Sequence, residues 1–381
     1  MECRLPDSDS IARDDLELLR NVAREAGALA LNWFERGAQV WEKSPNNPVT
    51  QADIAVNDRI AQRLMAARPT YGWLSEETKD DAENRDMSRV FVVDPIDGTK
   101  AFIAGQPFFC VAIARLEQDV PIVGVVYNPA TDEMFEAMRG DGARLNGEPI
   151  EVRARHHIDN CRMLGHREVF AHEGWSRPWP QMKLPDIMPN ALAYRIALVA
   201  AGRWDAAVAL SHKCDWDLAA ATLILEEAGG TASDHLGDAF SFNGRIPVQR
   251  SVVAAGAALH PLIIERVRNV PIPDPNCVTG ESVQGTIDLS KNEAAKMSTK
   301  APESHSQLLH LVIGGELKDV TGIEFEDLTK MEFVGAFGSY AAAYDAWKSA
   351  AQRTVDNAEM RFFILHAHRL LDPETGHTHD V

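Results

Sequence analysis

The stretch V-V-D-P-I-D-G-T-K, residues 92–100, decides how the fold of this chain is interpreted. Its first residues belong to an apolar run, which is typical of a strand covered on both faces. Proline and glycine then predict an abrupt turn, in which Asp94 and Asp97 stand three residues apart and Thr99 follows them. Taken alone, such a stretch is more often a plain strand-ending turn than a functional motif, since Asp, Pro and Gly are common turn residues.

The composition limits the class of protein. The chain has 381 residues, more than one typical domain, and a formal net charge of −18. This charge disfavours a nucleic acid polymer as partner, because such binding needs a basic surface. No apolar run approaches the roughly 20 residues of a membrane span, and the acidic N-terminus does not resemble a signal peptide. We therefore expect no membrane partner. The five cysteines are scattered and lack C-x-x-C spacing, which predicts a cytoplasmic protein that has neither disulfides nor a zinc site.

Two helices are predicted before this stretch. Apolar residues at helical spacing indicate a first helix from Asp9 or Ser10 to about Phe34. After a loop rich in proline and asparagine, Thr50 and Asp53 have the spacing of a capping box at the start of a second helix. Asp53 therefore has a purely structural explanation, because an acid in the first turn is favoured by the helix dipole.

A short strand around Trp73 runs into Glu76, which by itself is most simply a solvated acid. Beyond Thr99 the chain predicts an antiparallel meander, and the dipeptide N-G at residues 146–147 is a strong hairpin signal. The predicted strands of the meander cover residues 108–116, 121–127 and 133–138.

The next segment predicts alternating strands and helices. We expect strands at 161–164, 204–210 and 251–255 and helices at 190–203, 218–228 and 261–267. Gly229 and Gly230 would close the second of these helices as its C-cap. Asp217 stands at its start, where an N-cap is the simplest structural explanation.

Residues 271–306 differ in kind, since they are polar, contain several prolines and predict a flexible linker. Residues 307–381 then predict a small α+β module near the lower size limit of a self-supporting domain. Its predicted elements are strands at 308–313, 331–336 and 361–366, a turn at Gly314-Gly315, and a helix at 339–353.

Four acids stand at the ends of predicted elements: Glu76, Asp94, Asp97 and Asp217. Hard divalent cations such as Mg²⁺ prefer carboxylate oxygens and accept phosphate oxygens as further ligands. Gly98 lets the backbone approach an anion closely, so the amides of Gly98 and Thr99 could hold a phosphate. Because acids repel a phosphoryl group, a phosphate site of this composition needs metal ions.

Three ordered motifs carry a family resemblance: W-L-S-E-E (residues 73–77), D-P-I-D-G-T (94–99) and W-D-L-A-A-A…E-E-A-G-G (216–230). From about residue 9 to 270 the chain resembles the inositol monophosphatase superfamily. These are Mg²⁺-dependent, lithium-sensitive phosphomonoesterases, which include inositol monophosphatases, 3′(2′),5′-bisphosphate nucleotidases and some fructose-1,6-bisphosphatases. The resemblance implies an α/β fold, a layered αβαβα sandwich whose halves cover residues 1–150 and 151–270. It also implies a small phosphorylated metabolite as substrate, and its members are commonly homodimers.

The resemblance implies a role for each matching residue. Two or three Mg²⁺ ions would be held by Glu76, Asp94, the carbonyl of Ile96, Asp97 and Asp217. Substrate would contact Asp97, Gly98, Thr99 and Asp217. The residues implied in catalysis are Glu76, Thr99 and Asp53, which would orient a water for in-line attack on phosphorus. Lys43 matches a basic residue of a mobile loop that folds over the metals.

The substrate is less closely specified. D-G-T-K-A-F-I, with Lys100, and L-A-Y-R-I, with Arg195, resemble the bisphosphate nucleotidases more than the inositol enzymes, whose substrate-binding glutamate falls at about Ala209. The resemblance therefore favours hydrolysis of adenosine 3′,5′-bisphosphate to AMP. The alternative explanation of Arg195 is a surface residue of its helix. The alternatives are an inositol-1-phosphate or sugar-phosphate phosphatase and, in another class, a non-catalytic regulatory or binding protein.

Residues 307–381 resemble a small bacterial domain family of unknown function. For this module we expect an interaction or regulatory role, with a partner that the sequence does not identify.

Overall fold

A computed structural model of the chain describes residues 8–44, 47–171, 175, 177–275, 310–316, 327, 330, 332–337, 346 and 360–366. These residues separate into two compact units, the described parts of 1–293 and of 294–381. Among the helices described, none has the length and apolar character that crossing a membrane requires. The predicted domain boundaries at residues 150, 270 and 306 stay predictions.

The first layer is a pair of helices, α1 (Ser8–Arg36) and α2 (Gln51–Ala67), which confirms the two predicted helices. Between them β1 (Val40–Ser44) and β2 (Asn47–Thr50) pair antiparallel, where the sequence predicted a loop. The capping box is present, because the Thr50 hydroxyl accepts from the Asp53 amide and the Asp53 carboxylate accepts from the Thr50 amide.

The second layer is a seven-stranded sheet of order β3-β4-β5-β6-β7-β8-β9, in which β3 pairs parallel with β4 and the other pairs are antiparallel. A short helix, α3 (Ala82–Arg85), connects β3 to β4. The strands are β3 (Gly72–Ser75), β4 (Arg89–Asp97), β5 (Cys110–Glu117), β6 (Val120–Asn128), β7 (Glu133–Met138), β8 (Ala143–Leu145) and β9 (Glu148–Pro149). The predicted meander and hairpin are confirmed.

Strand β4 is apolar on both faces because both faces are covered. Phe91 and Val93 pack in the cluster with α1 and α2, whereas Val90 and Val92 pack in the cluster with α6 (Leu192–Ala200) and α7 (Asp215–Glu227). The uninterrupted apolar run of the sequence follows from this two-sided burial.

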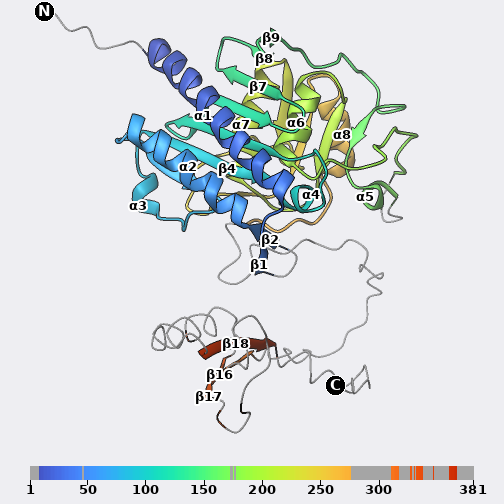
Figure 1. Ribbon diagram of the computed structural model, residues 1–381. Coiled ribbons are helices and arrows are strands. Elements are labelled where there is room, and N and C mark those ends of the chain that lie inside the picture. The colour runs from blue at the N-terminus through green and yellow to red at the C-terminus, as the bar shows by residue number, and fades with distance from the viewer. Residues whose placement is uncertain are drawn as a thin grey trace, which may run out of the picture. The chain divides into compact units, whose positions relative to one another are not determined.

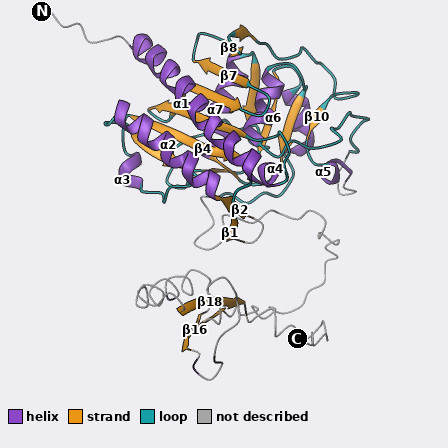
Figure 2. Cartoon of the chain, in the orientation of Figure 1, coloured by secondary structure: helices purple, strands orange, loops and turns teal. Residues whose placement is uncertain are grey.

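Helices α6 and α7 form the third layer, and a second sheet of order β10-β11-β15-β13 forms the fourth (Figure 1). Its strands are β10 (Met163–Leu164), β11 (Ala206–Ala209), β13 (Gly230–Ser233) and β15 (Val252–Gly256). Helix α8 (His260–Val267) packs on the outer face of this sheet and completes the predicted αβαβα sandwich (Figure 2). The shorter elements are α4 (Thr99–Ile103), α5 (Arg167–Ala171), β12 (Lys213–Cys214) and β14 (Val248–Gln249).

Two predictions about α7 are wrong. The helix begins three residues earlier than predicted, and its N-cap is Cys214 rather than Asp217. Asp217 is instead the third residue of the helix and accepts a hydrogen bond from the Cys214 amide. Gly229, with φ of +82°, follows the end of the helix as predicted. Gly230 does not belong to this helix end, because it is the first residue of β13.

The C-terminal unit contains a three-stranded antiparallel sheet of order β17-β16-β18. Its strands are β16 (His310–Glu316), β17 (Glu332–Phe337) and β18 (Met360–His366). The predicted turn at Gly314-Gly315 is wrong, because both glycines lie inside the central strand and pair with β18. The predicted linker beyond residue 275 and the predicted helix at 339–353 lie outside the described residues, apart from residue 346.

Candidate functional site

Three carboxylates converge where β4 ends and α7 begins. One oxygen atom from each of Asp94, Asp97 and Asp217 lies within 4.8 Å of the other two. Asp94 and Asp97 are buried and Asp217 is half-buried. The predicted motif and the distant acid of α7 are therefore brought together.

An irregularity in β4 places Asp94 and Asp97 on one face. Residues an odd number of positions apart point to opposite faces of a regular strand. Here Asp94 pairs with Ala112 and Asp97 with Cys110, so β4 spends one more residue than β5 over this interval. Such a bulge turns the later side chain to the face of the earlier one. Both carboxylates consequently face the layer of α6 and α7.

Backbone amides orient all three carboxylates. Asp97 Oδ2 accepts from the Ala193 amide of α6 at 2.6 Å, and Asp94 Oδ1 accepts from the Ile96 amide at 3.1 Å. Asp217 Oδ2 accepts from the Cys214 amide at 3.1 Å. Each acid is thus held by the backbone of the element that carries it or packs on it.

The cluster concentrates negative charge in a buried place. Burial, followed by the charges of Glu76 and Asp97, raises the pKa of Asp94 well above its usual range. Burial also raises the pKa of Asp97 to about 6, although the Ala193 amide opposes the shift, and the pKa of Asp217 to about 7. Carboxylates gathered in this way are stabilised by a cation, and an all-oxygen donor set suits a hard divalent ion. These residues therefore fit the predicted metal site.

Glu76 and Ile96 lie beside the three-acid cluster. The Glu76 amide donates to the Val93 carbonyl at 3.2 Å, which continues the pairing of β3 with β4. Glu76 is half-buried, and its charge raises the pKa of Asp94, so the two side chains are within electrostatic reach. The Ile96 carbonyl accepts a hydrogen bond from the Thr99 hydroxyl at 3.2 Å.

The predicted pairing of Thr99 with Asp53 is present. The Thr99 hydroxyl lies 3.1 Å from Asp53 Oδ1, to which it can donate. The other oxygen, Asp53 Oδ2, accepts from the Thr50 hydroxyl at 2.6 Å and from the Thr50 amide at 2.8 Å. Asp53 therefore caps α2 with one oxygen and accepts from the Thr99 hydroxyl with the other, while its role in catalysis stays a prediction.

Gly98 is required by the turn that follows the cluster. Its φ is +94°, a conformation that side chains disfavour. An added Cβ would lie 2.8 Å from the Phe108 carbonyl oxygen and 3.0 Å from the Ala191 Cβ. Glycine thus allows the chain to turn directly from the acids into α4.

Residues 13–271 match the model of the inositol monophosphatase family. The chain belongs to this family. It is 34% identical over 227 residues to a histidinol-phosphatase of Chlorobaculum parvum, covering 58% of this chain and 86% of that protein. It is 34% identical over 266 residues to an inositol-1-monophosphatase of Rhizobium meliloti, covering 67% of this chain and 96% of that protein.

Several solved structures share the fold. The extragenic suppressor protein suhB of Bartonella henselae matches with a TM-score of 0.59 and 29% identity, covering 68% of this chain and 100% of that chain. An IMPase of Thermotoga maritima matches with a TM-score of 0.57 and 27% identity, covering 67% and 96%. The family and the named relatives show that the chain is a phosphomonoesterase. Residues 308–367 separately match a domain of unknown function, DUF4170.

Two cations are within electrostatic reach of Asp217. Arg195 is buried within α6, so the alternative of a surface arginine is wrong. Lys213 is half-buried in β12, and the sequence analysis missed it because a single lysine carries no spacing signal. Both positive charges lower the pKa of Asp217, against the larger effect of burial.

The remaining predicted positions contribute less to the described site. Ala209, where the inositol enzymes place a glutamate, lies half-buried in β11 and offers no carboxylate. Lys100 is exposed in α4. Lys43 belongs to β1, and its side chain lies outside the described residues.

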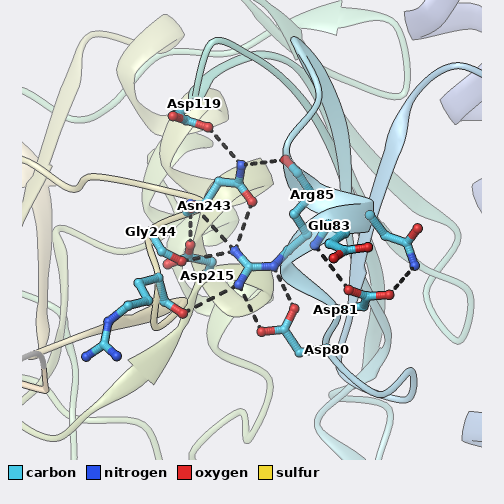
Figure 3. A network of polar contacts seen from close by, with 10 residues as sticks. Asp80, Asp81, Glu83, Arg85, Asp119, Asp215, Asn243 and Gly244 are labelled. Atoms are coloured by element: carbon cyan, nitrogen blue, oxygen red, sulfur yellow. Dashed lines mark hydrogen bonds and ion pairs between the residues drawn. The ribbon is translucent and has the colours of Figure 1, made fainter.

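A polar network fixes the start of α7 (Figure 3). Asp215 is fully buried. Its carboxylate accepts hydrogen bonds from the backbone amide of Asn243 and from Gln249 Nε2, both at 2.7 Å. Arg85 of α3 donates through Nη1 to the carbonyls of Asn243 at 3.3 Å and Gly244 at 3.0 Å. The network therefore links the connection between β3 and β4 to the first turn of α7, two segments that carry acids of the site.

Proposed function

We propose that this protein is a Mg²⁺-dependent phosphomonoesterase that acts on a small phosphate ester, with a 3′(2′),5′-bisphosphate nucleotide as its substrate. The observation that carries the metal site is the convergence of Asp94, Asp97 and Asp217 within 4.8 Å. The Thr99–Asp53 hydrogen bond beside the same turn supports hydrolysis rather than storage of a cation.

The proposed ligands of two or three Mg²⁺ ions are the carboxylates of Glu76, Asp94, Asp97 and Asp217 and the carbonyl of Ile96. When bound, the metal ions supply charge neutralisation of the phosphate and stabilise the negative charge that develops on the attacking and leaving oxygens. Removal of any one of these ligands is expected to weaken metal binding.

The residues of the chain itself would hold the reacting water. Because Asp53 and the Ile96 carbonyl accept the Thr99 hydroxyl hydrogen, the Thr99 oxygen can accept a hydrogen bond from water. The carboxylate of Glu76 would accept the other hydrogen of that water. A lone pair of the water would then be directed at phosphorus, in line with the leaving oxygen. The Gly98 and Thr99 amides would donate to the phosphate.

The nucleotide assignment is supported by the two cations and by Ala209, which lacks the carboxylate expected for inositol binding. The relatives named above favour a second candidate, since two of the proteins with 34% identity are named for histidinol phosphate and inositol 1-phosphate. A sugar phosphate is the fourth ester to be compared.

Phosphate release by the full chain, with Mg²⁺ or with EDTA, tests the proposal. The substrates are adenosine 3′,5′-bisphosphate, inositol 1-phosphate, histidinol phosphate and fructose 1,6-bisphosphate. We expect Mg²⁺-dependent release, highest with the nucleotide, and near-complete loss in Asp94→Asn. Asp141→Asn, which changes an exposed acid in an ion pair with Arg144, is the matched control. Asp94→Asn with most of its Mg²⁺-dependent activity intact would refute the assignment.

Three further expectations from the resemblance belong to the same proposal. Lithium should inhibit the Mg²⁺-dependent activity, which an inhibition series measures directly. The chain should form a homodimer, and residues 307–381 should bind a partner still to be identified. Light scattering of the purified chain tests the dimer.

A further inference from the structure

Arg85 is a buried arginine outside the three-acid cluster, and it joins two segments that are distant in the sequence (Figure 3). Its exposed fraction is 4%, and it belongs to α3, between the segment that carries Glu76 and strand β4. Its Nη1 atom donates to Asn243 Oδ1 at 3.2 Å and to the Gly244 carbonyl at 3.0 Å, and its Nη2 atom donates to Asp80 at 2.9 Å. Because unpaired donors are costly when buried, these contacts hold the two segments in one arrangement.

Asn243 passes this arrangement on to α7. Its φ is +58°, a left-handed conformation that asparagine adopts more readily than most residues. Its backbone amide donates to Asp215 Oδ2 at 2.7 Å, and its side-chain amide donates to the Arg85 carbonyl at 3.2 Å and to Asp119 Oδ1 at 2.9 Å. In residues 234–247, the connection between β13 and β14 to which Asn243 belongs, the structure has no helix or strand. The position of this connection therefore depends on side-chain contacts of this kind.

Asp215 fastens the first turn of α7 to the same connection. It is the first residue of the helix, and both of its carboxylate oxygens accept from outside the helix, Oδ2 from the Asn243 amide and Oδ1 from Gln249 Nε2. Its backbone amide donates to the Pro247 carbonyl at 3.0 Å. The amides of a first helical turn have no partners within the helix, so contacts with other segments decide how that turn is oriented.

Asp217 lies two residues further along this turn, and its carboxylate belongs to the three-acid cluster. The other two acids of the cluster lie on β4, so its geometry depends on how the first turn of α7 is placed against β4. We propose that Arg85 and Asp215 are positioning residues that keep Asp217 at the point where the three carboxylates converge. This inference rests on the proposed function, because the cation that the cluster would bind is the proposed Mg²⁺.

Neither positioning residue is a ligand in this proposal. Both carboxylate oxygens of Asp215 are already occupied by N–H donors, and Arg85 offers no lone pair. The network orders the first turn of α7 before a cation arrives, so cation binding does not have to supply that order. Loss of either residue should therefore weaken cation binding while every ligand is still present.

Calorimetric titration of Mg²⁺ into the full chain, without substrate, tests the inference. We expect Asp215→Asn and Arg85→Met each to raise the Kd for Mg²⁺ by about 10-fold or more, the usual effect of changing a residue that orients metal ligands. The double variant should bind Mg²⁺ about as weakly as the weaker of the two single variants, because both changes release the same connection.

Arg139→Met is the matched control, because Arg139 pairs with Glu226 in the last turn of the same helix at 3.1 Å. Its Kd should stay within about twofold of the wild type, since the first turn of α7 is left in place. Phosphate release adds a second measurement. Excess Mg²⁺ should restore kcat of Asp215→Asn to within about threefold of the wild type, whereas it should not restore Asp94→Asn, which lacks a ligand.

A Kd within about twofold of the wild type in both folded single variants would overturn the inference and leave the network a purely stabilising role. An equal rise of Kd in Arg139→Met would also overturn it, as would a double variant in which the two single effects multiply. Asp215→Asn, which keeps the size of the side chain and one acceptor oxygen, decides the matter if Arg85→Met does not fold. A wild type that binds no Mg²⁺ and releases no phosphate from the tested esters would instead refute the proposed function.

Discussion

Replacing Asp97 with asparagine should make the metal-free protein more stable at mildly alkaline pH while it abolishes activity. Asp97 is 7% exposed and shares its surroundings with two other acids. Asparagine has nearly the same shape and keeps a carbonyl oxygen that can accept from the Ala193 amide. The substitution therefore removes the charge and leaves the local packing in place.

The magnitude follows from the pKa of Asp97, which is raised from 3.8 to about 6. Each unit corresponds to about 1.4 kcal/mol, so ionised Asp97 costs roughly 3 kcal/mol of stability in the metal-free fold. For domains of this size each kcal/mol shifts the melting temperature by about 2–4 °C. We expect the melting temperature of Asp97→Asn to be about 6–12 °C higher than that of the wild type when metal is absent.

The difference must depend on pH with a definite sign. A raised pKa means that the folded state holds the proton more tightly than the unfolded state, so stability falls as pH rises through the interval between 3.8 and about 6. Below this interval both states are protonated, and the variant and the wild type should have nearly equal stability. The gain should therefore be present at about pH 8 and mostly lost by about pH 4.

Thermal melts in EDTA at both pH values measure this effect, and melts with excess Mg²⁺ measure its reversal. Mg²⁺ should stabilise the wild type and leave Asp97→Asn almost unchanged, because bound ligand stabilises only the state that binds it. Asp141→Asn controls for the loss of one negative charge at an exposed position. A metal-free variant that is less stable than the wild type at about pH 8 would show that the clustered charges do not oppose folding.

Three further changes test the packing and the chemistry. Thr99→Val should lower kcat by about 100-fold or more with folding retained, as judged by circular dichroism, because no hydroxyl then orients water; a kcat within tenfold of the wild type would argue against this role. Arg85→Ala should lower the free energy of unfolding in urea by about 2–4 kcal/mol, whereas Arg63→Ala, at an exposed ion pair, should change it by less than about 1 kcal/mol. Gly124→Val should destabilise the fold by about 1–3 kcal/mol, because even an added Cβ would lie only 3.0 Å from Ala220 Cα of α7. An unchanged melting temperature would contradict this close packing.

Local patterns determined most elements and the identity of the acids. The capping box of Thr50 and Asp53 and the N-G hairpin each depend on neighbouring residues, so their structure could be predicted from spacing alone. The predicted turn at Gly314-Gly315 was wrong because a local pattern does not show long-range pairing. A glycine pair often marks a turn, but here the pairing of β16 with strands on both sides extends the strand through the two glycines. The N-cap of α7 was misassigned because a first-turn acid and a capping acid have the same local signature.

The sequence by itself determined that Asp94, Asp97 and Thr99 follow a strand buried on both faces, because a run of apolar residues and a turn are local properties. Only the tertiary structure decided that Asp94 and Asp97 share a face, since this depends on one extra residue in β4 relative to β5. It also decided that Arg195 is buried, with two nitrogen atoms that lack a hydrogen-bond partner among the described residues. Register and burial arise from contacts between distant segments, and no spacing within one segment encodes them.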